Sequence, residues 1–144
     1  MSPVSIFWSK AKGLVVIPAK ARTEAGFWMD IEPVAVVPLG ERAAVRSVIR
    51  LAAFRPVDVI PTPARDKFPK PVVLKPGKVR SWSQFHWNYS CAFINQEKDG
   101  PLRFEVWEKC ADGSYQPDSQ TPVRYFSMLD EAVEAAIVEI QKPE

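Results

Sequence analysis

The sequence predicts an α+β protein in which antiparallel strands form one or two sheets and two helices pack against one face. Three observations lead to this fold class: stretches of apolar–polar alternation, two segments of helical periodicity, and breaks rich in proline or glycine between them. The chain has 144 residues, of which 47% are hydrophobic and 25% are charged. These values are typical of a folded domain with a real core, so we expect a single domain over residues 1–144.

The first half reads as strands followed by a helix. Alternating side chains predict strands over residues 3–8, 14–21 and 26–37. From residue 41 to residue 54 the apolar residues instead recur every three or four positions, which predicts a helix. The members of this apolar helical face are Val45, Val48, Ile49 and Ala52.

Residues 55–80 differ from both halves in composition. They contain six of the 14 prolines and carry a charge of +5, from seven basic and two acidic side chains. Proline restricts the backbone and removes hydrogen-bond donors, so we expect a semi-rigid extended connector. Residues 72–74 are expected to form one short strand within it.

The second half repeats the order of strands and then a helix. We expect a strand over residues 81–95, its hairpin partner over 102–110, a further strand over 123–126 and a helix over 127–141. The side chains expected on one face of the first of these strands are Phe85, Trp87, Tyr89, Cys91 and Phe93. Ser127 and Asp130 have the spacing of a capping box, which predicts that the last helix begins at Ser127. Residues 1–54 and 81–144 therefore read as a pseudo-repeat.

The net charge of +2 hides a difference between the two ends of the chain. Residues 1–90 carry +8 and residues 91–144 carry −6. Such an asymmetry is typical of a partner-binding surface, but it also lets the two halves attract each other, and the sequence leaves both interpretations open.

The reactive side chains do not assemble into a recognisable catalytic or metal-binding motif. His86 is the single histidine, and Cys91 lies five residues away, which places the two on opposite faces of the expected strand. There is no glycine-rich phosphate loop and no Cys-x-x-Cys pair. We therefore expect neither an enzyme nor a cofactor, a metal ion or a small-molecule substrate.

The remaining features concern the cell compartment. No apolar run approaches the roughly 20 residues that span a bilayer, and the first residues lack the pattern of a signal peptide. We expect a cytoplasmic protein without a membrane partner. Cys91 and Cys110 are expected to be reduced, as is usual there, although a disulfide between neighbouring strands stays open.

The repeated order of strands and then a helix, with the Asp112-Gly113 turn leading to the helix at Ser127, resembles the whirly-type single-stranded DNA-binding fold. It is also similar to the whirly-like folds of immunity proteins from bacterial contact-dependent growth-inhibition systems. The second resemblance implies a small cytoplasmic protein without catalytic residues, which binds one cognate toxin domain, often a nuclease, and blocks it. Inhibitors of basic nucleases tend to be acidic, and here only the second half has that sign.

The first hypothesis is therefore a toxin-neutralising immunity protein that presents an acidic hairpin to a basic toxin surface. Trp107 is its candidate apolar anchor. The acidic candidates are Glu97, Asp99, Glu105, Glu108 and Asp112.

The alternative hypothesis is a module that binds single-stranded nucleic acid. Bases stack on aromatic rings and phosphates pair with basic side chains, and a basic arm precedes Trp82 in this sequence. The candidate residues are Arg42, Arg46, Arg50, Lys75, Lys78, Arg80 and Trp82. Arg42, Arg46 and Arg50 recur every four residues and so share one helical face.

Overall fold

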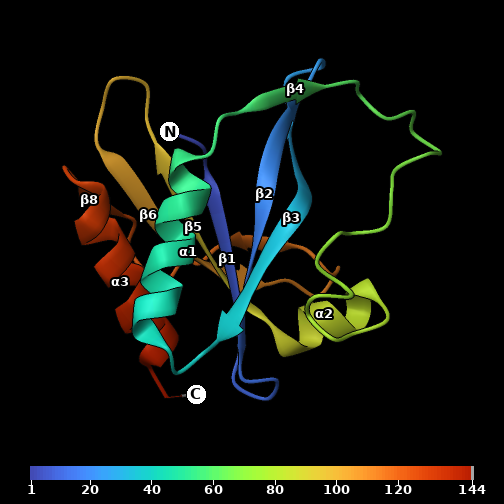
Figure 1. Cartoon of the computed structure of the whole chain (residues 1–144). Coiled ribbons are helices and arrows are strands. Elements are labelled where there is room, and N and C mark those ends of the chain that lie inside the picture. The colour runs from blue at the N-terminus through green and yellow to red at the C-terminus, as the bar shows by residue number, and fades with distance from the viewer. Residues whose placement is uncertain (144) are drawn as a thin grey trace.

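The computed structural model describes residues 1–143, and within them eight strands form one sheet that is accompanied by three helices (Figure 1). The elements are β1 (Val4–Ser9), β2 (Leu14–Thr23), β3 (Trp28–Pro38), α1 (Arg42–Phe54), β4 (Asp58–Ile60), α2 (Trp82–Asn88), β5 (Ser90–Gln96), β6 (Leu102–Lys109), β7 (Tyr115–Pro117), β8 (Arg124–Phe126) and α3 (Leu129–Gln141). No helix of these residues combines the length and the apolar character needed to cross a membrane.

The sheet joins the two halves through their first strands. Its order is β3–β2–β1–β5–β6–β7, and β1 pairs antiparallel with β5 so that Phe7 lies opposite Cys91. β8 also pairs antiparallel with β6, and the short β4 pairs in parallel with the end of β2. The predicted α+β class with antiparallel strands is confirmed, but the prediction of two helices is wrong, because a third helix, α2, precedes β5.

One face of the sheet packs against α1 and α3, which lie side by side (Figure 1). Alternate residues of β1, namely Val4, Ile6 and Trp8, point to this face and are buried. α1 adds Val45, Ile49 and Ala53, as its helical periodicity requires. Buried residues of β5, β6 and α3 complete the same cluster, so both halves of the chain build the core of this face.

Two ion pairs connect α1 to α3 at the edge of this core. Arg46 Nε donates to Glu134 Oε1 over 2.6 Å, and Arg50 Nε donates to Asp130 Oδ1 over 2.9 Å. The Arg46 guanidinium lowers the pKa of the Glu134 carboxyl. The basic first half and the acidic second half thus meet at this helix pair. All four side chains are substantially exposed, so the pairs orient the helices more than they stabilise them.

The opposite face is covered by α2 and by residues 72–79. Phe7, Val16 and Cys91 of the sheet contact Phe85 and Tyr89 there, together with the buried Val73. The predicted strand over residues 72–74 is wrong, because the backbone forms successive turns in which Gly77 N–H donates to the carbonyl of Val73. Residues 72–79 therefore form part of the core rather than a simple connector.

The predicted single strand over residues 81–95 is also wrong. Residues 82–88 form α2, and β5 begins at Ser90. The signal for this helix is present in the sequence, since Ser81 accepts a hydrogen bond from Gln84 N–H and Gln84 reaches back to Arg80 N–H. With residues 82–88 helical, Phe85 and Tyr89 are buried while Trp87 turns outward.

The start of α3 differs from the prediction in a smaller way. The helix begins at Leu129, and Met128 is its N-cap without a side-chain hydrogen bond. Ser127 instead donates its hydroxyl to Glu131 Oε1 over 3.1 Å. The Ser127–Asp130 capping box is therefore not formed, although Asp130 and Glu131 still place negative charge in the first helical turn.

Candidate functional site

Trp87 is the most exposed large apolar side chain among residues 1–143, with 83% of its surface accessible. It lies on α2, one position after His86 and two after the buried Phe85. Exposed tryptophan is costly to hydrate and is enriched at the energetic centres of protein interfaces. Its position on α2 therefore identifies a candidate partner-binding site.

The other side of α2 is tightly fixed to the sheet and its turns. The Trp82 indole N–H donates to the Gly113 carbonyl over 2.7 Å, and His86 Nε2 lies 2.9 Å from the Ser114 carbonyl oxygen. Lys109 Nζ donates to the Trp87 carbonyl. Because the helix backbone is held at several points, the Trp87 ring is presented on a rigid support, which reduces the entropy lost on binding.

A shallow hollow of about 330 Å³ surrounds Trp87 on the outer side of α2. It is lined by Ser83, Gln84, His86, Trp87 and Asn88. Asp112 stands close by in the turn before β7, and its Oδ1 accepts hydrogen bonds from the Ser114 hydroxyl and the Ser114 N–H. These two donors lower the pKa of the Asp112 carboxyl, which also interacts electrostatically with His86 of α2, so a negative charge lies near this hollow at neutral pH.

The acidic hairpin predicted from the sequence does not form one surface. Glu97 and Asp99 lie at the β5–β6 turn, whereas Glu108 and Asp112 lie at or beyond the opposite end of β6. β6 has eight residues, which separates the two exposed acidic pairs by about 20–25 Å. Strand alternation also sends Glu108 to the face opposite its neighbour Lys109.

Glu105 and Trp107 are engaged with each other rather than presented to solvent. Glu105 is only 8% exposed, and its Oε2 accepts the Trp107 indole N–H over 2.8 Å. Arg103 Nε lies 2.8 Å from Glu105 Oε1 as an ion pair without hydrogen-bond geometry. Trp107 also packs on Phe93, with ring centroids 5.4 Å apart. The predicted anchor is thus half-buried, whereas the Trp87 side chain is 83% exposed.

The predicted nucleic-acid residues are divided between separate parts of the molecule. On α1, Arg46 and Arg50 pair with carboxylates of α3, while Arg42 is exposed. Trp82 stacks on Phe85 at 5.4 Å and uses its indole N–H internally, so its ring is unsuited to stack on a base.

Residues of the basic arm do converge at one place. A hollow of about 340 Å³ between the arm and β3 is lined by three basic side chains, Lys70, Lys75 and Arg80, with Glu32 of β3 opposite them. Lys78 is exposed in the following turn, outside this lining. With three cations and one carboxylate in its lining, the hollow keeps a net positive charge, which favours a phosphate group.

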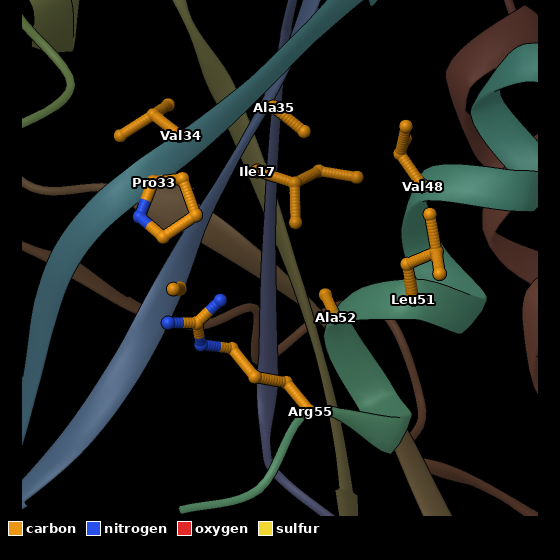
Figure 2. A pocket seen from close by; sticks show the side chains of 9 residues that line it. Ile17, Pro33, Val34, Ala35, Val48, Leu51, Ala52 and Arg55 are labelled. Atoms are coloured by element: carbon orange, nitrogen blue, oxygen red, sulfur yellow. The ribbon is translucent and has the colours of Figure 1, made fainter. Parts of the chain in front are cut away.

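A second apolar surface lies between α1 and β3, where the sheet extends beyond the cover of α1. Figure 2 shows this groove, which has a volume of about 280 Å³. Val48, Leu51 and Ala52 line it on the α1 side, and Arg55 extends across its end toward Pro33 (Figure 2). The lining from the sheet comprises Ile17, Ala19, Pro33, Val34 and Ala35. No pattern in the sequence indicated this groove, since it depends on how α1 crosses the twisted strands.

Both cysteines are free thiols, and Cys91 lies on β5 whereas Cys110 follows the end of β6. Cys91 is buried between the sheet and α2, and burial raises the pKa of its thiol. Cys110 is half-buried beyond the end of β6. Within residues 1–143 no three His, Cys, Asp or Glu side chains lie close enough together to hold a metal ion.

Fold and surfaces together define an α+β protein with an aromatic side chain and an apolar groove exposed on different sides of one sheet. No family model matches the sequence, and no curated protein matches it significantly. The structure is similar to a solved protein from Neisseria meningitidis described as "Protein of Unknown Function NMB0488", with a TM-score of 0.61 and 9% sequence identity. The similarity covers 97% of this chain and 93% of that protein. At this identity the comparison shows a shared fold.

Proposed function

We propose that this chain is a toxin-neutralising immunity protein with a whirly-like fold, which binds a cognate toxin domain through the outer side of α2. The observation that supports this most is Trp87, which is 83% exposed on a helix whose other side is anchored to the core. Because such a protein meets the toxin inside the cell, the proposal includes a cytoplasmic location.

The mechanism follows from the composition of this surface. Trp87 inserts into an apolar recess of the toxin and supplies most of the binding energy, since buried aromatic anchors dominate many interfaces. Asp112, which lies near His86 of the same helix, pairs with basic side chains that a nuclease uses to hold its substrate. Occupation of those side chains by a rigid protein surface excludes the substrate without any chemistry by the inhibitor.

The test uses the products of the genes adjacent to this one, among which the proposal expects a toxin domain. We expect this domain and the chain to co-purify and the chain to rescue growth, and we expect Trp87→Ala to weaken the affinity at least about 30-fold, which corresponds to about 2 kcal/mol. Titration calorimetry measures the affinity. Tyr125→Ala is the matched control, because Tyr125 is 55% exposed on β8 and should leave the affinity unchanged. An unaltered affinity of folded Trp87→Ala, or no binding by any neighbouring gene product, would refute the proposal.

A second candidate function, binding of single-stranded nucleic acid, is favoured by the basic hollow alone. Lys70, Lys75 and Arg80 would contact phosphates there. We expect an oligonucleotide to bind at low salt with an affinity that falls steeply as salt is added, and Lys75→Glu to reduce both the affinity and the salt dependence. Fluorescence anisotropy with a labelled single strand measures this. The absence of binding at low salt would eliminate this function.

A further inference from the structure

α1 carries a third surface that neither the sheet nor α3 covers. Its inner face packs on the core through Val45 and Ile49, and one flank pairs with α3 through Arg46 and Arg50. On the remaining side, Leu51 is 72% exposed and Phe54 is 71% exposed. Two large apolar side chains at i and i+3 form one ridge on a helix, so this side of α1 is an apolar protrusion.

The groove adjoins this protrusion directly. Leu51 belongs to both, because it lines the groove while most of its surface stays exposed. Three of the residues that line the groove are alanines, Ala19, Ala35 and Ala52, and their short side chains leave space between α1 and the sheet. An apolar ridge and an apolar hollow therefore lie next to each other on one surface.

Two opposite charges flank the same region. Arg55 lines the end of the groove, and Asp58 is exposed three residues later on β4, beside Ala21 of β2. Within residues 1–143 neither side chain has an ion-pair partner within 4.0 Å. Each is therefore available to a carboxylate or a guanidinium on another molecule.

We propose that a second copy of this chain covers the groove, so that the protein forms a two-fold symmetric dimer. In such an interface, if residue i of one copy contacts residue j of the other, then residue j of the first copy contacts residue i of the second. The same surface must therefore hold both complementary features. Here Leu51 and Phe54 of each copy enter the groove of the other, and Arg55 of each copy pairs with Asp58 of the other. This self-complementarity selects a second copy over an unrelated protein.

The dimer is independent of the toxin-binding surface. The groove lies on the face of the sheet that carries α1 and α3, whereas α2 and Trp87 lie on the opposite face. Both Trp87 side chains therefore stay exposed in the dimer, and loss of one property leaves the other measurable.

The experiment determines the oligomeric state of the full chain by light scattering after size exclusion and by sedimentation velocity. As the concentration of the unmodified protein is raised to about 100 μM, we expect its mass to reach twice the chain mass of 16.2 kDa. Leu51→Asp, which alters an exposed side chain and leaves the folded core intact, is expected to give the single-chain mass. Val138→Asp is the matched control, since Val138 is 59% exposed on α3 and should leave the dimer unchanged.

A charge exchange tests the register of the interface. Arg55→Asp and Asp58→Arg are each expected to weaken the dimer at least tenfold, and the double variant is expected to regain most of the loss. Circular dichroism checks that every variant retains its fold. A single-chain mass of the unmodified protein over the whole concentration range overturns the proposal, as does a folded Leu51→Asp variant that remains a dimer.

Discussion

Replacement of Phe85 by alanine is expected to lower the free energy of unfolding by about 3–5 kcal/mol. Phe85 is fully buried on the inner side of α2, where its ring stacks on Tyr89 at 4.3 Å and meets Phe7 edge-on at 5.1 Å. Alanine would leave a cavity between α2, β1 and residues 72–79, because the helix is tied to several turns and cannot collapse into the space. Urea unfolding followed by circular dichroism measures the loss.

Trp87→Ala is the control on the same helix. Trp87 lies two residues further along the chain, but its side chain is 83% exposed, so we expect a change within about 0.5 kcal/mol. A loss for Trp87→Ala as large as that for Phe85→Ala would contradict the assignment of inner and outer sides of α2. A small loss for Phe85→Ala would also contradict this assignment, since it would mean that Phe85 is not packed in the core. The strand expected over residues 81–95 differs from the helix in this respect, because it places both rings on one face.

Gly77→Ala is expected to destabilise the protein by about 1–3 kcal/mol through overpacking. A methyl group at Gly77 would lie 2.8 Å from the carbonyl oxygen of Val73 and 3.1 Å from Cε2 of Phe85. The Val73 oxygen belongs to the backbone and the Phe85 ring is confined, so neither yields at low cost. The Gly77 carbonyl also accepts the Tyr89 hydroxyl over 2.8 Å, and a shift of the turn would lengthen this buried hydrogen bond.

Gly40→Ala provides the comparison for Gly77→Ala. No atom lies within 4 Å of a methyl group at Gly40, and its backbone does not require positive φ. There alanine removes conformational freedom from the unfolded chain, so we expect an unchanged or slightly increased free energy of unfolding. Thermal and urea unfolding of both variants decide the matter: equal stability of the two variants would show that residues 72–79 are not packed as described.

The sequence predicted the first three strands and the two long helices well. The strands near residues 3–8, 14–21 and 26–37 and both long helices appear within a few residues of their expected bounds, since each signal depends on local periodicity and on nearby turns. The charge asymmetry also had a structural counterpart, because Arg46 and Arg50 meet Glu134 and Asp130 across α1 and α3.

The candidate site was harder to predict, because two patterns coincide in residues 81–95. Alternation of aromatic residues favours a strand, whereas Ser81 and Gln84 favour a helix start, and the packing of Phe85 against Phe7 stabilises the helix. In the helix the Trp87 side chain lies on the surface, whereas the expected strand placed it in the core with Phe85 and Tyr89. Glu105 changed in the opposite sense, from an expected surface position to a buried one, because Arg103 pairs with its charge and the Trp107 indole N–H donates to it.

Local spacing by itself thus determined that this chain has antiparallel strands, two helices on one face and a charge difference between its halves. The tertiary structure decided that residues 82–88 follow the helix signal rather than the strand alternation, that Trp87 is exposed, and that a groove lies beside α1. The physical reason is that each of these depends on side chains distant in sequence, such as Phe7 against Phe85, and on the angle at which a helix crosses a twisted sheet.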